Sequence, residues 1–445
     1  MAEYIMNGAE LASMLKGQLG NQMNFNGLFG EDAEDLHLSD DEISWWRDAK
    51  FGLFIHWGIY SVIGKGEWAY FNEKMAEDTY RKIAEEEFHP KRSAKEIVKE
   101  WIDIAESAGM KYAVMVTRHH DGFALWDSKG SYKNFTSMQC GQNADYVKAF
   151  TDICHERGIH TGLYYSPMDW RFSGYFDPKG QPESAALMKK QAYDQVEELC
   201  TQYGKVEILW YDGGWLSHQG TDADAAWLWE PLKLNRMARS YQAGIMVTPR
   251  SGYRGDFETD EGIHEVQGKI VPIPWEKCMS VSETWGYRPH DKFQDFPFLL
   301  RMLINTVCRD GNLLLNVGPD SEGCIPEQAQ KILKQMGTWL AENGEAIYAT
   351  RGGIWQPVDG VYGSTCTQTA IYVHILDCDT FQNITLPAKE MPKGMIIRKA
   401  TLLNGIEVKF EQNIEGVKIL IPDVVRQQNR LDTIVKLFIE HTVDD

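Results

Sequence analysis

The run Tyr112-Ala-Val-Met-Val-Thr117 decides the fold, because apolar runs of this kind recur along the chain at even intervals. Comparable runs begin at Ile159 and Val206, so the three starts are about 47 residues apart. These runs are apolar on both faces, as in strands of a parallel sheet that is covered by helices. A stretch with helical periodicity ends at glycine before each run, at 94–109, 145–158 and 184–204. Repeated units of this kind predict a parallel α/β fold.

Further elements extend this pattern in both directions. A strand is expected at 51–57, and another begins at 244–248. A helix at 299–308, a strand at 312–317 and a helix at 327–342 would complete a barrel.

The pattern changes after about residue 350. Short alternating stretches rich in β-branched residues follow, which predicts a small β-sandwich. We therefore expect an N-terminal extension at 1–43, a TIM-like (β/α) barrel domain at 44–350 and a C-terminal β-sandwich domain at 351–445.

Polar side chains fall where the predicted strands end. His56, the pair His119 and His120, Tyr164 and Asp212 close four different strands. Active sites of TIM barrels lie at the C-terminal ends of the strands, so this placement favours a barrel over a doubly wound sheet. The sequence carries no glycine-rich loop of the dinucleotide- or phosphate-binding type.

Composition narrows the class of partner. A net charge of −19 argues against a nucleic-acid partner. The sequence contains no apolar run of 18 or more residues, the length that would predict a membrane span. Fifteen Trp and nineteen Tyr fit either stacking on sugar rings or ordinary core packing. The eight Cys form no CxxC pair or zinc spacing, so we expect no metal site.

The N-terminus has no signal peptide pattern, which predicts a cytoplasmic protein, or a secreted or periplasmic one whose signal was removed. The oligomeric state is left open.

The stretch Val206-Glu-Ile-Leu-Trp-Tyr-Asp-Gly-Gly-Trp215 delivers a carboxylate at a strand end. Asp212 there can be a metal ligand, a general base or a nucleophile, and aspartate before glycine is also a common turn residue. Hydrolysis of a glycoside with retention needs a second carboxyl group about 5 to 5.5 Å from the first. The candidates in the following region are Glu258, Asp260, Glu261, Glu276 and Glu283, and a solvated acidic loop is the alternative for most of them.

Two other motifs suit the binding of sugar hydroxyl groups. His119 and His120 can donate hydrogen bonds to hydroxyls or pack in a core, and a metal would need a third ligand nearby. Glu67 and Trp68 offer a hydroxyl acceptor beside an aromatic face, or a loop ion pair.

Several ordered segments together resemble one known family. They include His119-His-Asp-Gly-Phe-Ala-Leu-Trp-Asp-Ser128 and Leu209-Trp-Tyr-Asp-Gly213, with further matches at 50–58, 66–68, 163–166, 275–276, 285–287 and 312–319. From about residue 45 to 348 the chain resembles the family 29 glycoside hydrolases, the α-L-fucosidases. The resemblance implies a TIM-like barrel, a C-terminal β-sandwich, retention of configuration and no cofactor. Its substrate would be a fucosylated oligosaccharide or glycoconjugate.

The resemblance also implies roles for individual residues. Asp212 matches the nucleophile, and Arg250 stands where the family often has an arginine in the site. Phe54 and Trp285 match aromatic residues around the fucose methyl group. The remaining matches hold the hydroxyl groups and walls of the fucose site: His56, Glu67, Trp68, His119, His120, Tyr164 and Trp210.

Two residues compete for the acid/base role. Glu261 fits the subgroup pattern Asp-Phe-x-Thr-x-Glu, and a mobile acid would suit the glycine-rich loop expected around it. Glu276 fits the Trp-Glu match but precedes a strand-like stretch and could be structural. We prefer Glu261.

Two other functions are compatible with the same motifs. One is a catalytically silent carbohydrate-binding protein, against which Asp212 and the available acids argue. The other is a barrel hydrolase for another sugar, such as an α-L-galactoside, because a fold does not fix function.

Overall fold

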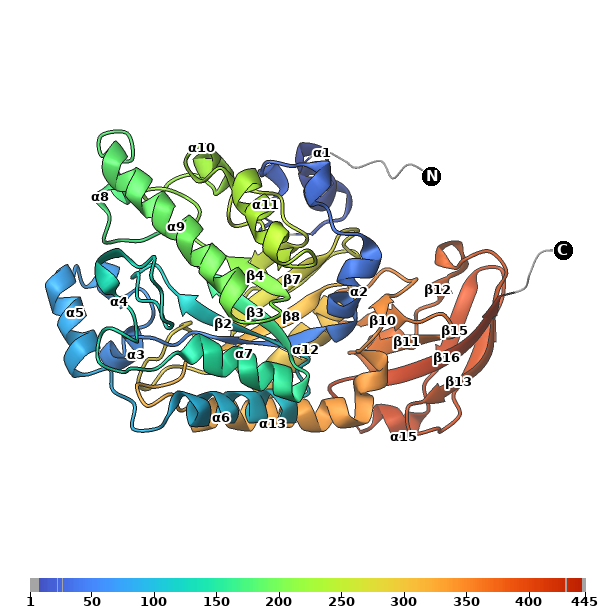
Figure 1. The fold of residues 1–445 in the computed structure, drawn as a ribbon. Helices are drawn as coiled ribbons and strands as arrows, with labels where there is room; N and C mark the ends of the chain where they lie inside the picture. The colour runs from blue at the N-terminus through green and yellow to red at the C-terminus, as the bar shows by residue number, and fades with distance from the viewer. Residues whose placement is uncertain (1–7, 22, 26, 429, 442–445) are drawn as a thin grey trace.

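The computed structural model describes residues 8–21, 23–25, 27–428 and 430–441. Eight parallel strands form one curled sheet in the order β5-β4-β3-β2-β1-β8-β7-β6 (Figure 1). The strands are β1 (Phe51–Ile55), β2 (Tyr112–Arg118), β3 (His160–Tyr165), β4 (Ile208–Tyr211), β5 (Met246–Val247), β6 (Glu258–Glu261), β7 (Trp275–Ser280) and β8 (Asn312–Val317). The predicted TIM-like α/β fold is confirmed, as a curled half-barrel.

The sheet is open between its edge strands β5 and β6. No helix separates these two strands in the chain, and residues 248–257 connect them directly. At this seam the Asp256 amide donates to the Val247 carbonyl at 3.0 Å, and the Val247 amide donates to the Asp256 carboxylate at 2.7 Å. The Asp256 side chain therefore accepts a hydrogen bond from the amide of an edge strand, where no neighbouring strand continues the sheet.

Long helices cover the outer face of the sheet (Figure 1). They begin and end at the signals that the sequence carries. Ser93 caps α6 in a capping box with Glu96, and Gly158 ends α7 at a φ of +68°. The covering helices are α6 (Ala94–Ser107), α7 (Tyr146–Arg157), α9 (Pro182–Gln202), α11 (Pro231–Tyr241), α12 (Phe296–Val307) and α13 (Glu327–Asn343).

Shorter helices fill the connections and the chain ends. They are α1 (Gly8–Ser13), α3 (Tyr60–Ile63), α4 (Ala69–Asn72), α5 (Glu77–Glu86), α8 (Ser173–Phe176), α10 (Ala226–Trp229), α14 (Cys378–Phe381) and α15 (Asp423–Arg426).

Helix α2 (Asp40–Ala49) packs against the inside of the curled sheet. Its Ile43, Trp46 and Ala49 belong to one buried cluster with the inward-facing strand residues, among them Phe54 and Trp210. This apolar cluster closes the N-terminal end of the barrel and leaves the C-terminal end for a site.

The N-terminal segment lies along strand β6. The Asn24 amide donates to the Asp260 carboxylate at 2.8 Å, and the Gly27 amide donates to the Glu258 carboxylate at 3.1 Å. The Glu31 amide reaches the Gly252 carbonyl at 2.8 Å. These bonds fix the segment against the open seam of the sheet.

The C-terminal region forms two antiparallel sheets around a core of their own (Figure 1). One sheet has the order β13-β16-β11-β10-β9 and the other β12-β15-β14. Their strands are β9 (Arg351–Gly352), β10 (Tyr362–Cys366), β11 (Ala370–Ile375), β12 (Leu386–Pro387), β13 (Met395–Leu402), β14 (Lys409–Gln412), β15 (Gly416–Leu420) and β16 (Thr433–His441).

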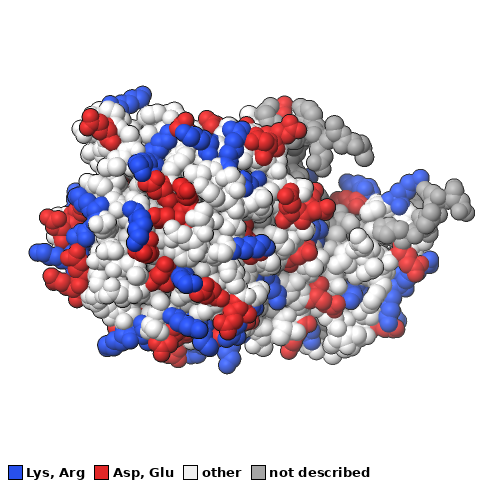
Figure 2. All heavy atoms as spheres, viewed as in Figure 1, with Lys and Arg blue, Asp and Glu red and all other residues white. Residues whose placement is uncertain are grey.

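Charged side chains of both signs are mixed over the face shown in Figure 2, so the net charge of −19 does not gather in one patch there. Among the helices of the described residues, none combines the length and the apolar character needed to span a bilayer.

Glu276 lies inside the barrel, on strand β7. The side chain is fully buried, and it accepts hydrogen bonds from the Tyr112 hydroxyl at 2.6 Å and the Trp210 indole at 3.0 Å. Burial raises the pKa of Glu276 to about 7, because a carboxylate loses its hydration there. The two hydrogen bonds join three strands below the C-terminal end of the barrel.

Glu276→Gln should make stability less dependent on pH. A raised folded-state pKa means that the stabilising contribution is complete below the ordinary value of 4.5 and is lost as pH rises through about 7. Between pH 6 and 8 the free energy of unfolding of the wild type should fall by about 1 kcal/mol relative to the glutamine variant. Denaturant unfolding at both pH values measures this, and equal slopes for the two proteins would contradict the burial argument.

Candidate active site

A cavity of about 110 Å³ opens at the C-terminal ends of the barrel strands. Side chains from five strands and from the loops that follow them converge there. The lining residues are Phe54, His56, Glu67, Trp68, His119, His120, Tyr164, Trp210, Asp212, Trp215, Arg250, Glu261, Cys278 and Trp285.

Asp212 follows strand β4 and is held by two donors. The Tyr164 hydroxyl donates to one carboxylate oxygen at 2.8 Å, and Arg250 donates to the other at 2.6 Å. Burial opposes ionisation of Asp212, but the Arg250 charge and the hydrogen bonds from Tyr164 and Arg250 act together against it and hold the pKa below its ordinary value of 3.8. Asp212 is therefore an ionised carboxylate whose orientation is fixed.

Gly213 lets the chain turn directly after this carboxylate. Its φ is +74°, and an added Cβ would lie 2.7 Å from the Met168 methyl carbon and 2.8 Å from a His120 ring carbon. The turn is secured where the Trp229 indole donates to the Gly214 carbonyl at 2.6 Å. Only glycine suits the position that aims Asp212 into the cavity.

Arg250 joins two acidic groups. One terminal nitrogen of its guanidinium binds Asp212, and the other makes a short hydrogen bond to Glu261. Arg250 is buried in the seam between β5 and β6, and Glu261 ends β6. The open edge of the sheet thus brings the second carboxylate to the cavity.

The prediction that Glu261 lies in a glycine-rich loop is wrong, because residues Glu258–Glu261 form strand β6, which pairs with β7. Alternation along this strand turns Glu261 into the cavity and its neighbours outward. Glu258 accepts from the Gly27 amide, and Asp260 pairs with Lys277 at 2.8 Å. The acidic stretch looked like a solvated loop because these partners are remote in the sequence.

Two histidines present fixed tautomers to the cavity. Burial lowers the pKa of His56 to about 4 and that of His120 to about 3, so both are neutral at pH 7. The side-chain amide nitrogen of Asn316 donates to the Trp285 carbonyl. The side-chain oxygen of Asn316 therefore faces His56 and accepts a hydrogen bond from its Nδ1 at 2.7 Å. The second ring nitrogen of His56 is then a hydrogen-bond acceptor.

His120 is oriented in the same way. Ser166 Oγ donates to the Met168 carbonyl at 3.2 Å and lies 2.7 Å from His120 Nδ1, from which it accepts. His120 Nε2 lies 3.7 Å from the Asp212 carboxylate. Beside it, His119 Nδ1 has no hydrogen-bond partner within the described part of the chain, although the residue is buried.

Glu67 is a third carboxyl group in the cavity. Burial raises its pKa, while the Gly286 amide donates to it at 2.9 Å. It can therefore hold a hydroxyl group either as an acceptor or, when protonated, as a donor.

Aromatic rings form the apolar part of the cavity wall. The ring centroid of Phe54 lies 5.0 Å from that of Trp210 and 5.9 Å from that of Trp285. Trp68 lies on the other side, with its centroid 5.7 Å from the ring of His120. An apolar corner next to a row of hydrogen-bonding groups suits a small ligand that is polar on one side and apolar on the other.

A family model described as "Alpha-L-fucosidase" matches residues 22–345. The chain belongs to the α-L-fucosidase family. The family 29 resemblance and the predicted enzyme class, a glycoside hydrolase, are thereby confirmed. Plasma alpha-L-fucosidase of Rattus norvegicus is 32% identical over 335 residues, which cover 69% of this chain and 70% of that protein.

Solved α-L-fucosidase structures share the fold. Isoenzyme 1 from Paenibacillus thiaminolyticus is 28% identical, with a TM-score of 0.74 over 90% of this chain and 99% of its own. The enzyme from Bacteroides thetaiotaomicron, trapped as a covalent intermediate with 2-fluoro-fucosyl fluoride, is 22% identical. Its TM-score is 0.80, over 94% of this chain and 100% of its own.

The cavity of this fucosidase collects every residue to which the family resemblance assigned a role, with the exception of the alternative acid/base Glu276. That side chain binds Trp210 from below the cavity and does not line it. Glu258 and Asp260 point away, and Glu283 is exposed beside Lys292 at 3.5 Å. Of the candidate acids that follow Asp212, Glu261 is the one that lines the cavity.

Sequence reasoning missed Trp215 and Cys278, which also line the cavity, and the two orienting residues Ser166 and Asn316. Trp215 lies three residues after Asp212, and Ser166 and Asn316 lie within segments that resemble the family. The sequence does not show in which direction these three side chains point. Cys278 lies in β7, two residues after Glu276, and a cysteine in a buried strand is not by itself a signal of a sugar site.

His119, His120 and Asp212 offer three possible metal ligands whose atoms lie within 4.8 Å of one another. The guanidinium of Arg250 already binds Asp212 there. A metal ion would therefore meet a neighbouring positive charge, which makes the set a poor cation site.

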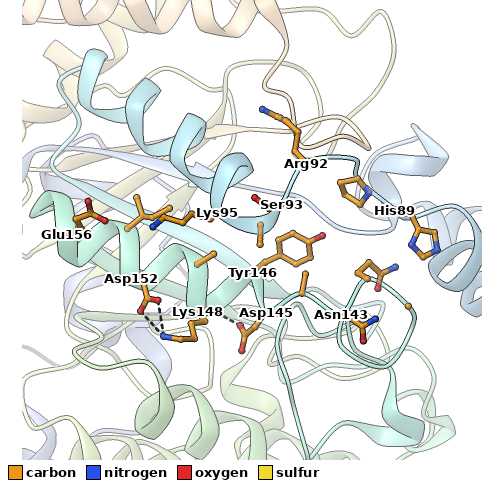
Figure 3. A pocket seen from close by; sticks show the side chains of 17 residues that line it. His89, Arg92, Ser93, Lys95, Asn143, Asp145, Tyr146, Lys148, Asp152 and Glu156 are labelled. Carbon is orange, nitrogen blue, oxygen red and sulfur yellow. Dashed lines mark hydrogen bonds and ion pairs between the residues drawn. The ribbon is translucent and has the colours of Figure 1, made fainter.

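A separate cavity of about 550 Å³ lies on the outside of the barrel, where helices α6 and α7 begin (Figure 3). It contains none of the residues predicted for the site. Its charged residues partly satisfy each other, as Lys148 and Asp152 do at 2.9 Å. The smaller cavity in the barrel is therefore the candidate active site.

Gly213→Ala should lower kcat/KM for an aryl α-L-fucoside by about 100-fold, because displacing a reacting group by about 1 Å has effects of this size. Gly158→Ala is the matched control. Its φ is +68° and nothing lies within 4 Å of an added Cβ, so it should lower stability by about 1 kcal/mol and leave activity unchanged. Steady-state kinetics and thermal unfolding separate the two effects. Equal activity of both variants would contradict the steric argument at Gly213.

Proposed function

We propose that this fucosidase acts with retention of configuration, with Asp212 as the nucleophile and Glu261 as the acid/base. The proposed substrate is a terminal α-L-fucose on an oligosaccharide or glycoconjugate. The observation that carries the proposal is the bridge through Arg250, which joins an ionised, oriented Asp212 to Glu261 across one cavity. Such a bridge is compatible with the carboxyl spacing of about 5 to 5.5 Å used by retaining enzymes. The trapped covalent intermediate of the Bacteroides thetaiotaomicron enzyme also supports retention.

In the first step an Asp212 oxygen attacks the anomeric carbon of fucose. The bond from that carbon to the glycosidic oxygen breaks, and Glu261 gives its proton to the departing oxygen. In the structure the Glu261 carboxyl group binds Arg250. When substrate binds, Glu261 must release Arg250 and bind the glycosidic oxygen instead.

In the second step water attacks the fucosyl ester of Asp212 from the side that the leaving group vacated. Glu261 accepts a proton from this water, the ester bond breaks and Asp212 returns as a carboxylate. Two displacements at the same carbon give α-L-fucose. Arg250 and Tyr164 stabilise the carboxylate as it re-forms.

The remaining cavity residues would recognise fucose itself. The free ring nitrogens of His56 and His120 and the carboxyl of Glu67 would bind its hydroxyl groups. His119, Trp68 and Trp210 would complete the walls. Phe54 and Trp285 would enclose the methyl group, and a hydroxymethyl group there, as in L-galactose, would be disfavoured by about 1 to 3 kcal/mol.

Asp212→Ala should leave a folded protein whose kcat is lower by about 1,000-fold or more, because the nucleophile is lost. Azide should restore turnover and yield the inverted fucosyl azide. Product analysis by NMR shows the configuration, and Asp212→Asn provides a variant of nearly equal shape. Turnover close to that of the wild type in either variant would remove Asp212 from the mechanism.

Glu261→Ala should lower kcat/KM for a fucosylated oligosaccharide by about 100- to 10,000-fold, since its leaving group needs a proton. The same variant should lose little activity on dinitrophenyl α-L-fucoside, whose leaving group departs unaided.

Glu276→Ala is the control, and it should reduce stability or affect both substrates alike. The assignment is reversed if Glu276→Ala alone shows the leaving-group dependence. If neither variant shows it, Glu67 is the other carboxyl group that lines the cavity.

A further inference from the structure

Glu261 separates two cavities. On one side it lines the small cavity with Asp212, and on the other it lines an outer cavity of about 630 Å³. Its side chain is 38% exposed, compared with 13% for Asp212, because it faces this outer space. The proposed proton donor therefore stands at the boundary between the small cavity and the outer one.

The N-terminal segment builds one side of the outer cavity. We define the N-terminal wall as the lining residues Lys16, Asn21, Met23, Asn24 and Phe25. The opposite side comes from the chain just after β6 and includes His264 and Glu265. Residues more than 200 positions apart in the sequence thus face each other across this space.

The wall is held by several contacts. The Asn21 side-chain amide donates to the carbonyls of Gln267 at 3.1 Å and Lys269 at 2.9 Å. The Asn24 amide binds Asp260, and the ring of Phe25 lies 6.0 Å from that of Trp275. The cavity is therefore formed by anchored groups on both sides.

We infer that this outer cavity binds the sugar to which fucose is attached, and that the N-terminal wall selects it. The inference rests on the proposed function of Glu261. A general acid must reach the glycosidic oxygen, so the sugar on the far side of that oxygen lies next to the acid. The outer cavity is the space next to Glu261 that is not the fucose pocket.

The lining matches a neutral pyranose. Lys16, Asn24, His264 and Glu265 bring donors and acceptors of both charge signs, which suits hydroxyl groups better than an anionic ligand. Met23 and Phe25 add apolar surface for a ring face. Asn21 is 2% exposed and lines the cavity, and its Oδ1 accepts no hydrogen bond from any described residue.

The test compares substrates with and without a second sugar. α-L-Fucosyl fluoride has no aglycone sugar and needs no proton donor, so it reports on the fucose pocket and Asp212 alone. Fucosylated disaccharides of α1,2, α1,3, α1,4 and α1,6 linkage report on both cavities. The full chain is used throughout, because the N-terminal segment packs into the core.

Two variants alter the wall without touching the proposed catalytic residues. Asn24→Ala removes an exposed side chain and keeps the backbone bond to Asp260, and Asn24→Trp should fill the cavity. Gln18→Ala is the control, since Gln18 is exposed on the same segment and does not line the cavity.

We expect Asn24→Ala to lower kcat/KM for the preferred disaccharide by about fivefold, as the loss of one hydrogen bond would, and Asn24→Trp to lower it further. Activity on fucosyl fluoride should stay within about twofold for all three variants, and Gln18→Ala should match the wild type on every substrate.

The inference is overturned if the Asn24 variants change neither activity, if they lower both activities equally, or if the wild type hydrolyses fucosyl fluoride but no disaccharide. Failure of the wild type to hydrolyse fucosyl fluoride would instead reject the proposed function.

Discussion

A single buried guanidinium, that of Arg250, binds Asp212 with one nitrogen and Glu261 with another. Two carboxylates in one desolvated cavity repel each other, and a shared cation removes that repulsion. It also keeps Asp212 ionised against the effect of burial. The arrangement exists because the sheet is open between β5 and β6, where Arg250 and Glu261 enter. The seam of the half-barrel is therefore part of the site.

The rest of the barrel supports this pair from below. The apolar cluster with α2 closes the N-terminal end, and above it the buried Glu276 binds Tyr112 and Trp210. Trp210 forms part of the cavity wall, so a hydrogen bond inside the barrel fixes a surface that would meet the sugar. Glu276 shows that a carboxyl group matched by sequence can act on a site through its neighbours.

Burial sets the protonation of the remaining groups. It keeps His56 and His120 neutral, and hydrogen bonds to Asn316 and Ser166 select the nitrogen that carries the proton. The N-terminal segment then extends the site outward, since it covers β6 and forms one wall of the outer cavity. Strand β6 therefore borders two pockets. The inner pocket has side chains of fixed protonation, and the outer pocket is lined by charged, polar and apolar side chains.

The sequence alone predicts strands β1 to β4 and the helices α6, α7 and α9 between them in the correct order, because apolar periodicity, N-caps and glycine ends are local signals. It also determined that His56, Tyr164 and Asp212 would meet, since parallel strands bring their C-terminal ends to one edge. It did not reveal β6, whose acidic residues find Lys277 and the amides of Asn24 and Gly27 only in the folded chain. Nor did it separate Glu261 from Glu276. Both side chains point into the barrel, but Glu261 pairs with Cys278 at the level of the cavity, whereas Glu276 pairs with Thr259 and lies below it. Strand pairing and the packing of a distant N-terminal segment set that register, and these contacts exist only in the tertiary structure.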